Sequence, residues 1–144
     1  YKNDKIMKWD HSPYLEVSVD QVMHNFVTSG LYTENIIFAK GFFSNTLPIL
    51  GKQYLTFSIL RLDGDMYEST VDALYNLYDK LSVGGYIYID DWGIYPAKHA
   101  CLDFFKVHNI NPTIITPDEV SGYWKKTEEI KIQYWRYEQK KWTD

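Results

Sequence analysis

Two groups of acidic residues follow apolar runs in this chain, and they are its clearest candidates for chemistry. Asp63 comes directly after the run 54–62, and Asp90 and Asp91 come directly after the run 86–89. Each run is typical of a buried β-strand, and the carboxyl ends of neighbouring parallel strands lie at one edge of a sheet. We therefore expect the three carboxylates to converge there, although they lie far apart in the sequence.

Converging carboxylates repel one another unless a cation or protons neutralise them. Ligand sets made only of oxygen suit hard cations such as Mg²⁺ or Ca²⁺. The run Asp63-Gly64-Asp65 by itself is often only a turn, because Asp and Gly favour turn conformations. Together with the second acidic pair, it predicts a divalent-metal site at the active edge of an α/β enzyme.

The elements that would position these residues alternate between strand and helix. Strands are expected at 34–39, 54–62 (covered on both faces), 86–89, 112–117 and 123–127, with a strand or extended arm at 130–137. Helices are expected from the capping box at Ser18 to Gly30, from Ser69 to the pair Gly84-Gly85, from Pro96 to about Asn109, and as a short segment broken at Pro48. This alternation predicts βαβ units with right-handed crossovers, and therefore an α/β fold.

Composition limits the classes of partner. The chain has 144 residues, which suits one domain or part of one, and its net charge of -4 gives no electrostatic reason to expect nucleic-acid binding. No apolar stretch is long enough to cross a bilayer, so no membrane partner is expected. The single Cys101 cannot form an intramolecular disulfide, which favours a reducing compartment such as the cytoplasm, and its apolar neighbours are typical of a buried small side chain.

Several residues near the acidic groups have two readings. Arg61 alternates with Leu60 and Leu62 and should share a face with Asp63, either as a partner of the acidic cluster or as a structural ion pair. Glu68 either contacts a substrate or stabilises a helix N-terminus.

Aromatic residues and histidines near the second acidic group are also ambiguous. Trp92 and Tyr95 form either a substrate wall or part of the packing. Four histidines show no metal-type spacing, and each is expected to be a surface or hydrogen-bonded side chain: His11, His24, His99 and His108.

Residues 60–70, 81–85 and 89–93 together resemble the macrocin O-methyltransferase (TylF-type) family, and segments 41–48 and 122–126 also resemble parts of it. The likeness covers about residues 15–126. It implies a Rossmann-like S-adenosylmethionine fold with three αβα layers and a mostly parallel sheet that ends in an antiparallel hairpin. It also implies a divalent metal, usually Mg²⁺, and the transfer of a methyl group to a hydroxyl of a small molecule, often on a sugar of a natural product. A homodimer is implied as well.

The resemblance also assigns roles at the acidic groups. Asp63, Asp90 and Asp91 fall on the family's metal ligands. A divalent ion there would bind the acceptor hydroxyl, lower its pKa and orient it. Asp63 is the first candidate for the base and Asp65 the second.

The cofactor side of the family pattern is less complete. Phe42, Phe43 and Ser44 fall where related folds line the adenine pocket. However, no Gly-rich strand-to-helix turn precedes residue 41, and the acidic residue that would bind the ribose is also missing. We therefore expect residues 1–144 to be a single, partial methyltransferase domain, either the C-terminal portion of a longer enzyme or a shortened relative.

Other function classes also use such acidic motifs. A phosphatase of the haloacid dehalogenase type has Asp-x-Asp after a strand and a later acidic pair for Mg²⁺, but Met66-Tyr67-Glu68 fits that pattern poorly. A nucleotide-sugar glycosyltransferase uses Asp-x-Asp as well, and the surrounding run again fits it less well. The non-enzyme alternative is a cofactor-free interaction domain whose aromatic segment 134–137 packs on a partner.

Overall fold

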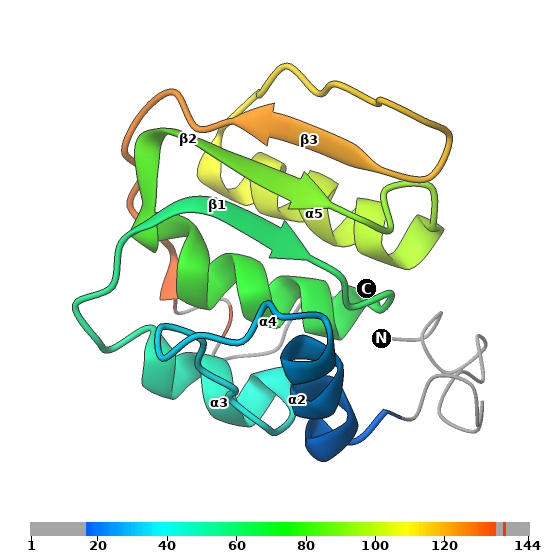
Figure 1. Cartoon of the computed structure of the whole chain (residues 1–144). Helices are drawn as coiled ribbons and strands as arrows, with labels where there is room; N and C mark the ends of the chain where they lie inside the picture. The colour runs from blue at the N-terminus through cyan, green and yellow to red at the C-terminus, as the bar shows by residue number, and fades with distance from the viewer. Residues whose placement is uncertain (1–16, 135–136, 138–144) are drawn as a thin grey trace.

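The computed structural model describes residues 17–134 and 137, and its centre is a sheet of three strands in the order β1-β2-β3. Strand β1 (Phe57–Leu62) pairs in parallel with β2 (Leu81–Ile89), and β3 (Gly122–Lys125) pairs with β2 in the antiparallel direction. Leu62 lies opposite Ile89 in the register. The residues that follow these two strands therefore leave the sheet side by side (Figure 1).

Two helices cover one face of the sheet. Helix α4 (Tyr67–Leu77) connects β1 to β2, and helix α5 (Tyr95–His108) follows β2. Both lie on the same side of the strands (Figure 1). The apolar core between the layers includes Leu60, Leu62, Val71, Leu74, Ile87, Ile89, Ala100, Phe104 and Trp124. On the opposite face Ile59 and Tyr86 are exposed, so within the described residues the sheet carries a helix layer on one side only.

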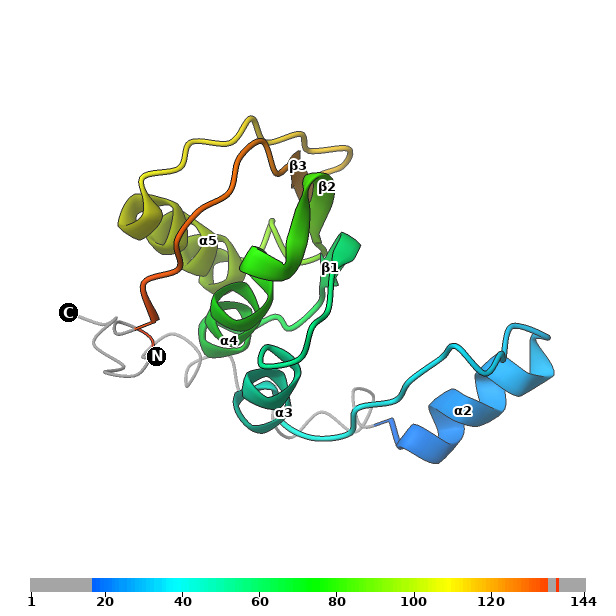
Figure 2. The same cartoon turned by 90° about the vertical axis from the view of Figure 1, so that its left-hand side faces the viewer.

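The two N-terminal helices of the described chain differ in their contact with this core. Helix α3 (Phe43–Leu50) packs beside α4, whereas helix α2 (Val19–Thr28) has no buried residue and projects away from the sheet (Figure 2). The predicted cap is confirmed, because Ser18 accepts a hydrogen bond from the amide of Gln21 at 3.1 Å. The side chain of Gln21 donates to Asn25 instead of reaching back to Ser18.

Of two strands predicted in the first half of the chain, one is absent and the other is shorter and more exposed than expected. Residues 34–39 form no strand, because a strand needs a neighbour to pair with and β1 pairs only with β2 among the described residues. The next strand begins at Phe57 instead of residue 54, and its outward-facing residues Ile59 and Arg61 are exposed instead of covered.

The boundaries around α4 also differ from the prediction. Met66, not Ser69, occupies the N-cap position of α4, without a capping hydrogen bond from its side chain. A 3-10 turn, η2 (Tyr78–Lys80), follows the helix. The pair Gly84-Gly85 does not stop a helix but lies inside β2. A Cβ at Gly85 would lie 2.7 Å from the carbonyl oxygen of Ser58, so the close approach of β1 and β2 at this irregular register requires glycine.

Smaller corrections concern Pro48 and the C-terminal half. Helix α3 continues through Pro48 instead of breaking there. Residues 112–117 make only an isolated bridge between Ile115 and Tyr123, and residues 130–133 form no strand. The helix that starts beside Pro96 is confirmed and ends at Asn109 in the left-handed conformation.

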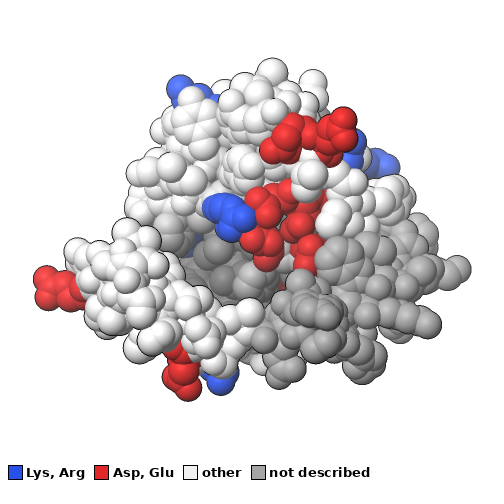
Figure 3. Space-filling view, turned by 45° about the vertical axis from the view of Figure 1, so that its right-hand side comes forward, with Lys and Arg blue, Asp and Glu red and all other residues white. Residues whose placement is uncertain are grey.

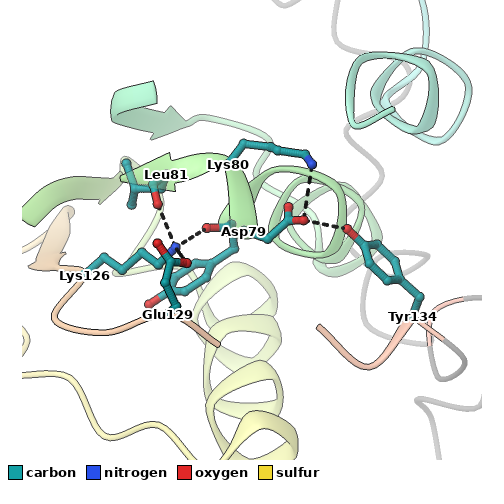
Figure 4. A network of polar contacts seen from close by, with 7 residues as sticks. Asp79, Lys80, Leu81, Lys126, Glu129 and Tyr134 are labelled. Atoms are coloured by element: carbon teal, nitrogen blue, oxygen red, sulfur yellow. Dashed lines mark hydrogen bonds and ion pairs between the residues drawn. The ribbon is translucent and has the colours of Figure 1, made fainter. Parts of the chain in front are cut away.

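A buried lysine fixes the chain after β3. Lys126 has a fully buried side chain, and its Nζ donates to the carbonyl of Leu81 at 2.7 Å, to the carbonyl of Tyr78 at 3.4 Å and to Glu129 at 2.7 Å (Figure 4). Its three N–H groups match these three acceptors. The contact ties the segment after β3 to the junction between η2 and β2.

Across residues 17–134 and 137, none of the helices has both the length and the apolar character that a membrane span requires.

Candidate active site

The carboxyl ends of β1 and β2 bring three predicted metal ligands together. Asp63, Asp90 and Asp91 each offer one oxygen, and these oxygens all lie within 4.8 Å of one another. The parallel register produces this meeting, because the amide of Asp90 donates to the carbonyl of Leu62 at 2.9 Å and extends the pairing past the strand ends. Figure 3 shows acidic side chains gathered beside a hollow in this face of the molecule.

Arg61 joins this cluster directly. Its Nη1 lies 2.9 Å from a carboxylate oxygen of Asp63, and its Nη2 lies 2.8 Å from one of Asp90. The hydrogen bond to Asp90 is the main reason why the pKa of Arg61 is raised above its usual value. The sequence left open whether Arg61 partners the cluster or forms a structural ion pair, and the structure shows that it pairs with two of the three carboxylates.

Asp91 is the buried member of the cluster, with 6% of its surface exposed. One of its carboxylate oxygens accepts a hydrogen bond from the backbone amide of Asp65 at 2.9 Å. Asp65 has a φ of 53°, a left-handed conformation that Asp tolerates better than most residues. The turn after β1 and the turn after β2 are therefore joined.

Asp65 lies in a strongly negative environment. Its burial, its contact with Asp91 and the charges of Asp63 and Asp90 together raise the pKa of Asp65 to about 6. Burial is the largest of these causes, and the neighbouring carboxylates act in the same direction.

Of the predicted adenine-pocket residues, Phe43 is the one that the structure places against the acidic turn. A Cβ on Gly64 would lie 3.3 Å from a ring carbon of Phe43 and 3.0 Å from Cβ of Ser69, so the turn passes close to both side chains. Phe42 is 80% exposed and Ser44 is also exposed. The assignment of Phe42, Phe43 and Ser44 to a cofactor pocket remains a prediction.

The aromatic residues after the acidic pair divide between the two readings. Trp92 is buried and packs against Gly122 and Trp124. Tyr95 is 60% exposed and stacks on His99, with ring centroids 5.2 Å apart. Trp92 therefore belongs to the packing, and only Tyr95 is free to form part of a substrate wall.

Sequence reasoning missed a polar contact beside the site. The hydroxyl of Tyr67, at the start of α4, donates to Asp103 of α5 at 2.7 Å, and His99 lies 3.8 Å from the same carboxylate. The spacing of His99 and Asp103, one helical turn apart, was the available signal. This contact ties the start of α4 to the middle of α5.

The chemistry of the donor set fits a hard divalent cation. Three carboxylates meet within a span that one ion can bridge, and two of them remain partly exposed, with 48% of the Asp63 side chain and 35% of the Asp90 side chain accessible. S-adenosylmethionine fits less completely. Residues 17–134 contain no Gly-rich strand-to-helix turn that could hold its methionine end.

Comparison with known families decides which α/β class this site belongs to. The model of the macrocin-O-methyltransferase (TylF) family matches residues 1–126. The chain belongs to this family. The family resemblance expected from residues 60–70, 81–85 and 89–93 is therefore confirmed.

Individual relatives of this TylF-family chain include three bacterial enzymes. The demethyldecarbamoylnovobiocin O-methyltransferase of Streptomyces niveus is 40% identical over 78% of this chain. The 8-demethyl-8-(2,3-dimethoxy-alpha-L-rhamnosyl)-tetracenomycin-C 4'-O-methyltransferase of Streptomyces olivaceus is 38% identical over 82% of this chain, and the mycinamicin III 3''-O-methyltransferase of Micromonospora griseorubida is 34% identical over 78%. The chain spans 43–44% of the length of these relatives.

Solved structures agree on the fold of the TylF-family chain. The O-methyltransferase NovP superimposes with a TM-score of 0.83 and 38% identity, over 89% of this chain and 53% of NovP. The TDP-rhamnose 3'-O-methyltransferase CalS11, at 15% identity and a TM-score of 0.61, supports the fold alone, over 78% of this chain and 55% of CalS11. The expected Rossmann-like methyltransferase fold is confirmed, with about half of the NovP chain represented.

Proposed function

We propose that this chain supplies the metal-binding and acceptor-binding part of an S-adenosylmethionine-dependent O-methyltransferase. The acceptor would be a hydroxyl of a small molecule, in the class of sugars attached to natural products. The observation that carries the proposal is the meeting of Asp63, Asp90 and Asp91 at the carboxyl edge of β1 and β2 in a TylF-family chain. Three relatives, each an O-methyltransferase, support the reaction class.

The metal-holding residues would be Asp63, Asp90 and Asp91, and a divalent cation such as Mg²⁺ held there would bind the acceptor hydroxyl and lower its pKa. Asp91 is oriented by the amide of Asp65, so the buried ligand has a fixed carboxylate. Asp63 and Asp90 keep an exposed side, which leaves an approach for the acceptor from solvent.

The chain offers two carboxylates to take the acceptor's proton. Asp63 is the nearer candidate because it belongs to the cluster and is half-exposed. Asp65 is adjacent, partly buried and bonded through its backbone to Asp91. We favour Asp63 as the base and Asp65 as a residue that positions Asp91.

Tyr95 and Phe43 are two aromatic side chains near this edge that keep an exposed surface. Tyr95 is exposed four residues after Asp91, and Phe43 lies against Gly64. Flat, exposed aromatic surfaces suit the apolar face of a sugar ring. We propose that Tyr95 and Phe43 line the acceptor site.

The test is calorimetric titration with S-adenosylhomocysteine, with and without Mg²⁺, followed by a methyl-transfer assay on sugar-bearing acceptors. Saturable binding and transfer that falls after Asp90→Asn, while Asp20→Asn behaves as the parent, supports the proposal. Asp20 is a matched control because it is an exposed carboxylate in the first turn of α2. Absence of cofactor binding by folded protein, both as this chain and in the longest natural form of the polypeptide, would contradict the proposal and favour a non-catalytic interaction domain.

A further inference from the structure

Arg61 occupies two of the carboxylates that the proposed metal would use. One guanidinium nitrogen lies 2.9 Å from Asp63 and the other lies 2.8 Å from Asp90, so a single side chain bridges the ends of β1 and β2. The bridge is possible because Asp63 follows β1 directly, two residues after Arg61 and on the same face, while Asp90 directly follows the paired strand β2. Guanidinium geometry suits this arrangement, since its planar fork presents separate N–H groups to separate acceptors.

A positive group at this position does two things. It neutralises part of the repulsion among Asp63, Asp65, Asp90 and Asp91, which otherwise have no cationic partner among the described residues. It also repels, and takes oxygens from, any divalent ion that approaches the same carboxylates. The cluster can therefore be stable without a metal, at the cost of a lower metal affinity.

The side chain of Arg61 is able to leave. Fifty-six per cent of it is exposed, so its charge can move into water without first breaking a buried contact. Arg61 differs in this respect from Lys126, whose side chain is fully buried and bonded to three acceptors. The exposed position makes exchange between the guanidinium and a metal ion physically accessible.

We propose that Arg61 is a resident counter-ion of the acidic cluster, one that holds Asp63 and Asp90 together without a metal and sets the metal affinity of the site by competition. This inference rests on the proposed function, because the competing cation is the one assigned to Asp63, Asp90 and Asp91. Arg61 is accordingly a positioning residue and not a catalytic one. A plain surface ion pair would explain one of its contacts, but such a pair has no reason to fall on two members of the same three-carboxylate group.

The experiment compares Arg61→Gln with the unmodified chain in two measurements, the thermal midpoint in EDTA and the affinity for Mn²⁺ followed by electron paramagnetic resonance. Lys52→Gln is the matched control, because Lys52 is exposed and follows α3, near the start of β1 and away from the strand ends. We expect Arg61→Gln to lower the midpoint in EDTA, to regain it when Mg²⁺ is added, and to bind Mn²⁺ roughly tenfold more tightly. Lys52→Gln should change neither measurement.

Arg61→Lys keeps the positive charge but offers a single ammonium in place of the two-armed guanidinium. It is the second variant if Arg61→Gln fails to fold. Its Mn²⁺ affinity should lie between those of the unmodified chain and Arg61→Gln. Equal or weaker Mn²⁺ binding by both Arg61 variants would overturn the role of Arg61 alone, since the metal site would still exist. Absence of Mn²⁺ binding by the unmodified chain and by both variants would instead contradict the metal site, and with it the proposed function.

Discussion

The backbone amide of Asp65 donates a hydrogen bond to the buried carboxylate of Asp91 at 2.9 Å. This contact joins the turn after β1 to the turn after β2, although the two residues are 26 positions apart. It holds one proposed ligand in place from the neighbouring turn. The arrangement explains why the acidic cluster has a defined shape and is not merely a set of surface charges.

Two substitutions of Asp91 should distinguish the role of its hydrogen bond from the role of its negative charge. Asp91→Asn keeps an oxygen that can accept from the Asp65 amide, so we expect a folded protein whose metal affinity falls by more than the roughly 10–100-fold that loss of an outer partner costs. Asp91→Ala removes the acceptor as well and should lower the free energy of unfolding by a further 1–2 kcal/mol or so, about the cost of one unmade hydrogen bond. Urea denaturation and metal titration of both variants measure these effects. Equal unfolding free energies for the two variants would show that the contact does not hold the turn.

Lys126 should be a strong determinant of stability. Lys126→Met keeps the approximate length of the side chain but removes the 2.7 Å hydrogen bond to the carbonyl of Leu81 and the longer one to the carbonyl of Tyr78, which still accepts from the amide of Leu81. We expect the free energy of unfolding to fall by about 2–3 kcal/mol. Lys80→Met is the control, because Lys80 is partly exposed and makes only an ion pair with Asp79 at 3.4 Å, so its loss should cost less than about 1 kcal/mol. Urea denaturation compares the two. A similar small loss for both variants would mean that the buried lysine network adds little.

Gly122 is required by its contact with Trp92. A Cβ at residue 122 would lie 2.6 Å from a Trp92 ring atom, so Gly122→Ala must displace either the ring or the start of β3. We expect a loss of about 1–3 kcal/mol in the free energy of unfolding, as for other overpacked sites. Because Trp92→Leu removes the ring, the double variant should lose less than the sum of the two single losses. Strict additivity in this cycle would contradict the steric explanation.

Asp118 provides a test of pH dependence. Its carboxylate accepts from the amides of Val120 and Ser121 and from the Ser121 hydroxyl, and these bonds hold the pKa of Asp118 below its usual value. A lowered pKa in the folded state means that the stabilisation is present above the unfolded value of about 3.9 and is lost as the pH falls through the folded value. We expect the gap in thermal midpoint between the unmodified chain and Asp118→Ala to be constant above about pH 5 and to narrow below about pH 4.

Asp118→Asn is the control for that titration. Its amide oxygen can still accept from the loop amides but does not ionise, so its gap to Asp118→Ala should not change over the same pH range. If the difference in thermal midpoint between the unmodified chain and Asp118→Ala stays constant through pH 4, the charge of Asp118 is not what stabilises the loop.

Local signals and strand ends were predictable from the sequence. Ser18 caps α2 because the capping pattern lies within four residues, and Asp63, Asp90 and Asp91 meet because β1 and β2 are parallel and end in register. The conformation of residues 34–39 was not predictable in this way, since an apolar run becomes a strand only where a partner strand exists.

The pair Gly84-Gly85 shows a second limit of sequence reasoning. Gly84 has a φ of 90° and Gly85 lies against the backbone of β1, so these residues serve an irregular strand pairing instead of a helix end. Both uses need glycine, and only the tertiary contact distinguishes them. Arg61 is a similar case, because its alternation with Leu60 and Leu62 predicted its face but not its second partner, Asp90.

The most direct test of the central claim is a Mn²⁺ titration, followed by electron paramagnetic resonance, of the unmodified chain against Asp63→Asn, Asp90→Asn and the Asp20→Asn control. The account predicts one saturable site in the unmodified chain and in Asp20→Asn, competed by Mg²⁺, and strongly weakened binding in the Asp63 and Asp90 variants. Equal binding by all four proteins, or binding by none of them, would contradict the assignment of Asp63, Asp90 and Asp91 as a metal site.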